Sequence, residues 1–115
     1  MSVSISHSIP AATTIRTSDI CGLWEVIRIS RGDSITYPWV GQRFKYSFQP
    51  EMNFLCLQNG QNSHGTWQLS EKIYETQRRY SIILNDTFEY SILDLDEDQI
   101  TLSDHINKYL LARRL

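Results

Sequence analysis

The sequence has few of the residues that cross-link a small domain. Its 115 residues include two cysteines, Cys21 and Cys56, which are too few for the disulfide framework of a small secreted domain and are not paired at metal-ligand spacing. Both lie among apolar residues, so we interpret them as reduced structural thiols. The three histidines, His7, His64 and His105, also lack metal-ligand spacing. We therefore expect no metal site, and we find no cofactor motif.

An excess of one charge and a long apolar run are also missing. Eleven Lys and Arg residues against thirteen Asp and Glu give a formal net charge of −2, which argues against a nucleic-acid partner. No run approaches the ~18 apolar residues of a membrane span, and the N-terminus has no basic segment followed by an apolar stretch. We expect a cytoplasmic protein without a membrane span.

The chain has the size and composition of one ordinary domain, with 41% hydrophobic residues. Residues 1–19 are rich in Ser and Thr and lack a sustained hydrophobic period, which predicts a flexible N-terminal arm before a domain at 20–115. Ser18 and Asp19 are suited to cap one helical turn that ends at Gly22. Such a turn would plug one end of a barrel.

From Gly22 onward, short runs of β-branched and aromatic residues recur about every ten residues, with turn formers between them, as in antiparallel all-β domains. The predicted strands are 23–30, 42–49, 52–58, 65–70 with a continuation to Tyr74, 78–84, 87–95, 99–103 and 108–113. Asn59-Gly60 and Asn85-Asp86 favour tight hairpins because Asn and Gly tolerate positive φ.

Short connections make successive strands pair, and eight such strands remove their exposed edges by closing into a barrel. The sequence therefore predicts a small antiparallel up-and-down β-barrel with an irregular N-terminal arm. One connection, residues 31–41, is long. At a barrel mouth it would be either a lid or simply a long loop.

Alternate residues of a barrel strand face the lumen. Phe44, Tyr46 and Phe48 form one inward set, and Tyr80 and Tyr90 belong to inward sets on later strands. These sets combine aromatic and aliphatic side chains with tyrosine hydroxyls.

The first strand is ambiguous because both of its sets are partly apolar. If Trp24 faces inward, a period of two places Arg28 in the lumen as well, where its guanidinium would anchor a ligand carboxylate. Tyr46, Tyr80, Tyr90 and Trp67 would form the walls of that site. The alternative is that Arg28 reaches solvent, or pairs with a glutamate such as Glu25 or Glu89.

Several short motifs occur in a suggestive order along residues 20–115. They are Gly22-Leu23-Trp24, Trp39-Val40-Gly41, Gly65-Thr66-Trp67, Ile100-Thr101-Leu102-Ser103-Asp104 and the closing run from Tyr109 to Arg114. Together they resemble the calycin superfamily, especially short bacterial lipocalin-like domains. The resemblance implies that Trp24 lies at the closed end of the barrel, with Arg113 or Arg114 across its indole, a contact worth about 0.5–2 kcal/mol.

Three functions remain open from the sequence. The leading hypothesis is binding of a small, largely apolar molecule, with or without an acidic group, inside the barrel. The second is a filled barrel that acts as a protein-interaction or homo-oligomerisation module, with Leu23, Ile27 and Ile29 as its contact face. The third is a cofactor-free cyclase or isomerase, for which the sequence offers no nucleophile and base pair, so an enzyme is the least favoured hypothesis.

Overall fold

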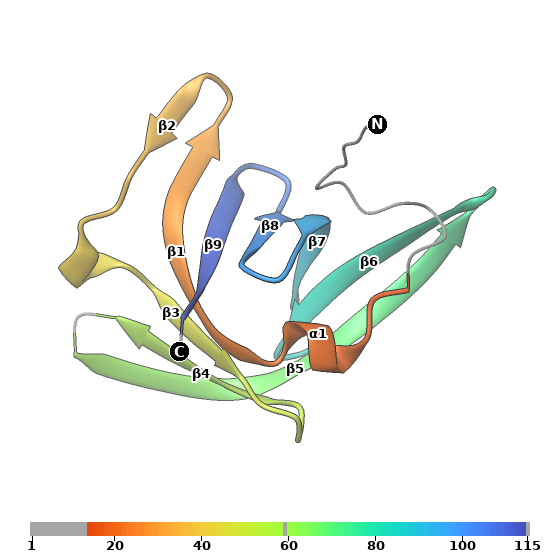
Figure 1. Ribbon diagram of the computed structural model, residues 1–115, viewed down its shortest axis with the longest axis horizontal. Helices are drawn as coiled ribbons and strands as arrows, with labels where there is room; N and C mark the ends of the chain where they lie inside the picture. The colour runs from red at the N-terminus through yellow and green to blue at the C-terminus, as the bar shows by residue number, and fades with distance from the viewer. Residues whose placement is uncertain (1–13, 59, 115) are drawn as a thin grey trace.

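The computed structural model describes residues 14–58 and 60–114, which fold mainly into antiparallel strands (Figure 1). The elements in chain order are α1 (Thr17–Ile20), β1 (Gly22–Arg31), β2 (Ser34–Thr36), the 3-10 turn η1 (Val40–Gln42), β3 (Lys45–Phe48), β4 (Asn53–Gln58), β5 (Gln61–Tyr74), β6 (Gln77–Leu84), β7 (Phe88–Leu95), β8 (Gln99–Ser103) and β9 (Lys108–Arg114).

Eight of these strands close into a barrel. The order of hydrogen-bonded neighbours is β1-β3-β4-β5-β6-β7-β8-β9, and β9 pairs back with β1 to complete the ring. Every pairing is antiparallel and joins strands that follow one another in the ring, so the predicted up-and-down β-barrel is confirmed. The additional strand β2 pairs with β1 and, together with η1, stands apart from the wall at the left of Figure 1.

Strand β5 pairs with a different strand along each of its two halves. Residues 61–66 pair with β4, and the second half, residues 67–74, pairs with β6. The far end of the β5–β6 hairpin extends beyond the barrel, to the right in Figure 1, and leaves Ile73 and Tyr74 exposed. The predicted strand began only at residue 65, because its polar first residues show no alternation that marks a half-buried strand.

The connection between β6 and β7 is a tight turn, as its residues indicate. Asn85 and Asp86 adopt φ values of 54° and 57° in the connection from β6 to β7, as a tight antiparallel hairpin requires. The Asn85 side chain also accepts a hydrogen bond from the backbone N–H of Thr66 at 3.0 Å, which ties this turn to β5. Two positions with positive φ, Met52 and Glu75, carry no sequence signal of that kind.

Two residues that precede the first barrel strand in the sequence belong to the hydrophobic core. Ile15 and Ile20 are buried against it, and α1 lies across one end of the barrel as the predicted plug. Ile15, which belongs to the predicted arm, and Ile20, the first residue of the predicted domain, therefore both contribute apolar surface to the core. The remaining part of the predicted arm, residues 1–13, lies outside the described residues.

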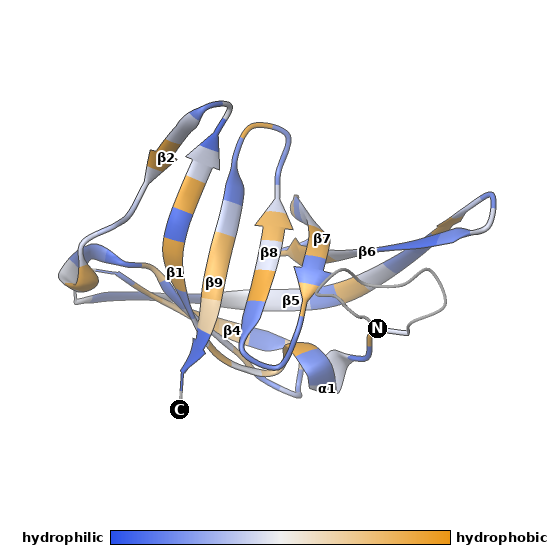
Figure 2. Ribbon diagram, turned by 45° about the horizontal axis from the view of Figure 1, so that its top comes forward, coloured by the Kyte–Doolittle hydropathy of each residue, from blue (hydrophilic) through white to orange (hydrophobic). Residues whose placement is uncertain are grey.

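Figure 2 shows hydrophobic and hydrophilic bands alternating along β1.

Candidate functional site: an apolar cavity in the barrel

The closed end of the barrel is organised around Trp24. Its indole is fully buried and donates a hydrogen bond from Nε1 to the carbonyl of Ile20, the last residue of α1, at 2.7 Å. The guanidinium carbon of Arg113 lies 4.1 Å from the ring centroid on the indole face. Arg114 turns away from the indole and donates from Nε to Glu25 Oε1 at 2.7 Å. Arg113, and not Arg114, therefore covers the indole of Trp24.

Arg113 also connects three separate segments. Its Nε donates to the carbonyl of Glu97 at 2.8 Å, and its two terminal nitrogens donate to the carbonyls of Cys21 and Asp19 at 2.8 and 2.9 Å. These acceptors lie on the β7–β8 turn, on the residue before β1, and on α1. One side chain therefore fastens the plug and a turn to the end of the barrel.

The glycine of the Gly22-Leu23-Trp24 motif has a physical explanation. Gly22 has φ +132°, a conformation that L side chains rarely adopt, and a Cβ at this position would lie 2.6 Å from Arg113 Nη1. Glycine thus permits both the backbone bend after α1 and the close approach of the guanidinium.

A cavity of about 220 Å³ lies in the lumen beyond this plug. The side chains that line it are aliphatic and aromatic, and the polar ones among them are tyrosines. The lining residues are Val26, Ile29, Phe44, Tyr46, Phe48, Ile82, Leu84, Tyr90, Leu102, Tyr109 and Leu111. Val26, Phe48, Ile82 and Leu111 are buried, whereas Ile29, Phe44, Tyr46, Tyr90 and Tyr109 are half-buried. The buried residues therefore lie at the deep end of the cavity. The five half-buried residues lie where the cavity reaches the surface, and we call them the mouth.

The prediction that Arg28 faces the lumen is wrong. A β-bulge interrupts the pairing of β1 with β9, so that Val26 lies opposite Leu111 and Arg28 lies opposite Leu110, with Ile27 as the extra residue. Directly opposed residues share a face, and a bulge reverses the alternation beyond it. As a result Ile29 lines the cavity and Arg28 lies on the outer face. The same reversal removes Ile29 from the contact face proposed for a filled barrel.

Two further predicted wall residues do not line the cavity. Trp67 is buried behind Phe48, with ring centroids 5.3 Å apart, and donates from Nε1 to the carbonyl of Gln49 at 3.0 Å. Tyr80 is buried near the start of β6 and donates its hydroxyl proton to Glu71 Oε2 at 2.7 Å. Both side chains lie on the inward face of their strand, because Trp67 pairs with Leu84 and Tyr80 alternates with Ile82, but neither reaches the cavity.

Tyr46 and Tyr90 do line the cavity, as the alternation on their strands predicts. Burial raises the pKa of both phenols, and for Tyr46 the adjacent Cys56 thiol adds to the effect. Burial likewise raises the pKa of the Cys56 thiol. Each of these groups therefore keeps its proton at neutral pH. The cavity wall is uncharged and offers hydroxyl groups that can donate a hydrogen bond.

Tyr109 is a lining residue that sequence reasoning missed. It packs edge-on against Tyr90 with centroids 6.1 Å apart, and its hydroxyl donates to Asp104 Oδ2 at 3.0 Å and accepts from Asn107 Nδ2 at 3.2 Å. The backbone N–H of Asn107 holds the pKa of Asp104 below its ordinary value, with help from the N–H of Ile106. An ionised carboxylate therefore lies beside the mouth.

Other sites considered from the sequence find no support from geometry. In the part of the chain that the structure describes, no group of three or more His, Cys, Asp and Glu side chains could hold a metal ion. His64 lies exposed on β5, and His105 lies exposed in the turn between β8 and β9. No helix within residues 14–58 and 60–114 is long and apolar enough to cross a membrane.

The closed eight-stranded barrel, its tryptophan and arginine plug and its apolar lumen define a lipocalin-like fold, as the motifs of the sequence indicate. The chain is similar to a lipocalin-like protein from Bacteroides uniformis, with a TM-score of 0.56 and 19% identity over 84% of this chain and 99% of that chain. An uncharacterized protein from Bacteroides eggerthii is similar with a TM-score of 0.58 and 15% identity, over 82% and 98% of the two chains. No family model and no curated protein matches the sequence.

Proposed function

We propose that the protein binds a small, largely apolar and uncharged molecule inside the barrel. The observation that carries this proposal is the cavity of about 220 Å³, which, within the described part of the chain, is lined by aliphatic side chains, phenylalanines and tyrosines. Apolar cavities of about 150 Å³ remain dry and accept benzene. The volume here therefore suits one or two small rings, and it is too small for a large lipid.

The polar groups of the cavity define the rest of the expected ligand. Tyr46 and Tyr90 keep their protons and offer hydroxyls to a ligand oxygen or nitrogen. Among the described residues, no Lys, Arg or His side chain lines the cavity, and Asp104 is ionised beside the mouth. A buried carboxylate would have no cation to compensate its lost hydration. An uncharged ligand therefore replaces the acidic one that an inward Arg28 would have favoured.

The test uses two probes of one shape, 2-naphthol and 2-naphthoate, which differ in charge at neutral pH. Binding is measured by isothermal titration calorimetry. We expect 2-naphthol to bind at least about tenfold more tightly than 2-naphthoate, because only the anion must be desolvated without a partner.

Two neighbouring variants supply the matched comparison. Ile29→Trp fills the cavity and is expected to weaken 2-naphthol binding by more than about tenfold, since the site loses its free volume. Arg28→Ala, one residue away on the outer face, is expected to leave the affinity for both probes unchanged. Thermal unfolding of each variant alone verifies that it is folded. Tighter binding of 2-naphthoate that Arg28→Ala abolishes would contradict the proposal.

A further inference from the structure

The segment between β1 and β3 exposes an unusual amount of apolar surface. We call residues 34–42, which comprise β2, η1 and the residues between them, the flap. Its large apolar side chains, Ile35, Tyr37, Trp39 and Val40, are between 56% and 81% exposed. Single exposed apolar residues are ordinary, but four in one short segment form a patch that calls for a partner.

The flap lies next to the cavity mouth. It begins beyond Ile29, whose partner in the β1–β2 pairing is Thr36. It ends two residues before Phe44, and both Ile29 and Phe44 line the cavity. A partner on the flap would therefore face the entrance to the lumen.

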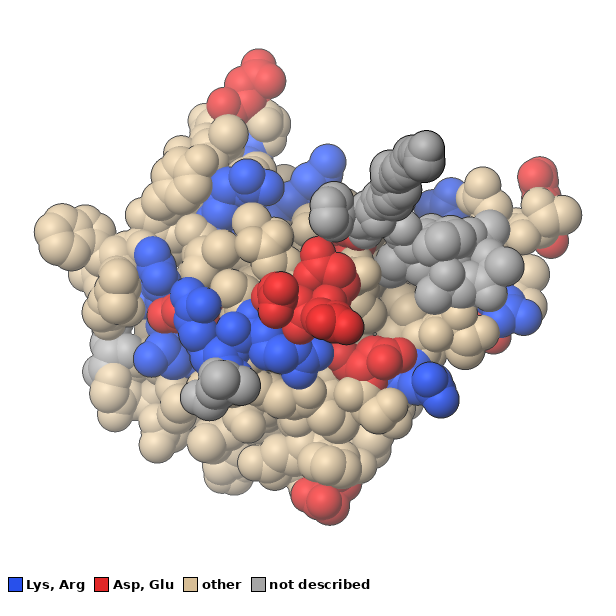
Figure 3. Space-filling model, in the orientation of Figure 1, with Lys and Arg blue, Asp and Glu red and all other residues tan. Residues whose placement is uncertain are grey.

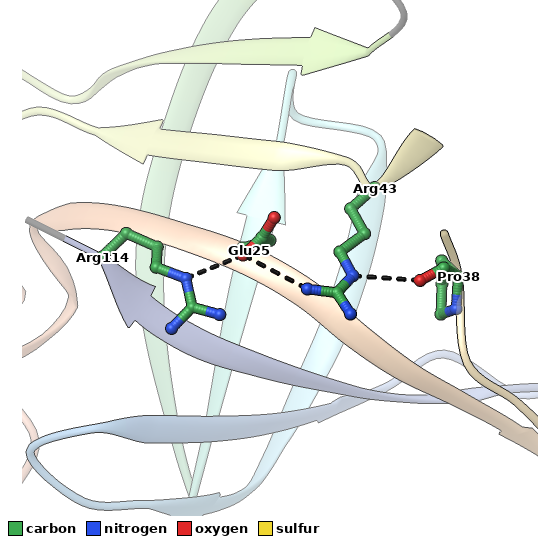
Figure 4. A network of polar contacts seen from close by, with 4 residues as sticks. All are labelled: Glu25, Pro38, Arg43 and Arg114. Atoms are coloured by element: carbon green, nitrogen blue, oxygen red, sulfur yellow. Dashed lines mark hydrogen bonds and ion pairs between the residues drawn. The ribbon is translucent and has the colours of Figure 1, made fainter. Parts of the chain in front are cut away.

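Polar contacts fix the flap in its outward position. Arg43, directly after the flap, donates from Nε to the carbonyl of Pro38 at 3.0 Å, and its Nη1 lies 3.7 Å from Glu25 Oε1 (Figure 4). Glu25 is 4% exposed on the outer face of β1 and also accepts from Arg114. The backbone N–H of Gln42 donates to the carbonyl of Trp39 at 2.8 Å. The backbone that carries the apolar side chains is thus held by Arg43, which connects Pro38 to the buried carboxylate of Glu25.

Basic residues flank the flap on both sides in the sequence, although the whole chain is slightly acidic. Residues 28–45 contain four cations, Arg28, Arg31, Arg43 and Lys45, against one anion, Asp33, so this segment carries +3 in a protein of net charge −2. The remainder has seven cations against twelve anions. Figure 3 shows Lys and Arg side chains gathered on this side of the barrel, beside the flap.

We propose that the flap docks on an anionic phospholipid bilayer and places the cavity mouth at the membrane surface. Trp and Tyr prefer the boundary between headgroups and acyl chains, and flanking basic residues are attracted to anionic headgroups. A second copy of this chain fits less well, because a two-fold interface would bring the same positive patch of both copies together. The proposal does not depend on the ligand of the cavity.

Tryptophan fluorescence of the full-length protein tests this docking directly. Trp24 and Trp67 are buried whereas Trp39 is 81% exposed, so a change in emission on adding vesicles reports mainly Trp39. We expect a blue shift, together with co-flotation, on vesicles of equal parts phosphatidylcholine and phosphatidylglycerol. Pure phosphatidylcholine should bind more weakly, and high salt should release the protein from the anionic vesicles.

Trp39→Ser and Ile73→Ser provide the matched pair. Both replace a large exposed apolar residue, but Ile73 lies on the β5–β6 hairpin at the other side of the barrel. We expect Trp39→Ser to lower the vesicle partition coefficient by about tenfold and Ile73→Ser to leave it unchanged. Absence of binding to anionic vesicles at low salt, or equal binding to neutral ones, would overturn the proposal. So would a concentration-dependent dimer that Trp39→Ser dissociates, since the flap would then be an interface between two copies.

Discussion

Arg113→Ala is expected to lower the free energy of unfolding by about 3–5 kcal/mol, which is a large part of the stability of a domain of this size. The substitution removes the cation over Trp24 and all three hydrogen bonds to the carbonyls of Asp19, Cys21 and Glu97. Carbonyls at the closed end would then be left without their charged donor. Denaturant unfolding followed by circular dichroism measures the change.

Arg79→Ala is the control for this prediction. The Arg79 guanidinium also lies over an aromatic ring, that of Tyr74 at 5.6 Å, but on the exposed β5–β6 hairpin. Its removal should cost less than about 1 kcal/mol. Equal losses for the two variants would mean that Arg113 does not fasten the plug.

Gly22→Ala is expected to destabilise the protein by about 2–4 kcal/mol, because a side chain at φ +132° is strained and its Cβ would collide with Arg113 Nη1. The measurement is again denaturant unfolding. Gly41→Ala serves as the control, since Gly41 has no positive φ and open space around the added Cβ.

A double variant separates strain from collision. If the collision contributes, Gly22→Ala combined with Arg113→Ala should cost less than the sum of the two single losses. Strict additivity of the two losses would show that the close approach of Arg113 does not require glycine at this position.

The fold could be predicted because its signals are local. Turn residues such as Asn85 and Asp86 and the alternation of Phe44, Tyr46 and Phe48 each depend on a few neighbouring positions. Short connections then leave little freedom in which strand pairs with which. The flap was expected to be a loop without β2 and η1, since Pro38 and Gly41 are typical of loops and its apolar residues do not enter the core.

The site was harder to predict because it depends on register and depth. The bulge at Ile27 reverses the faces of β1 beyond Val26, and nothing in the alternation marks it, since both sets of that strand are partly apolar. Trp67 and Tyr80 were assigned to the correct face, but alternation does not give the level along the barrel. Tyr109 could have been found, because it alternates with Leu111 and Arg113 along the strand that covers Trp24.

Native mass spectrometry shows whether the apolar cavity of the barrel is open to a small molecule. The wild-type protein is incubated with 2-naphthol, and its mass under native conditions is compared with that of the denatured chain. We expect one added probe molecule that is lost on denaturation and is absent from Ile29→Trp under the same conditions. A wild-type protein that carries only its chain mass, or an adduct that Ile29→Trp retains, would mean that the probe does not bind in this cavity.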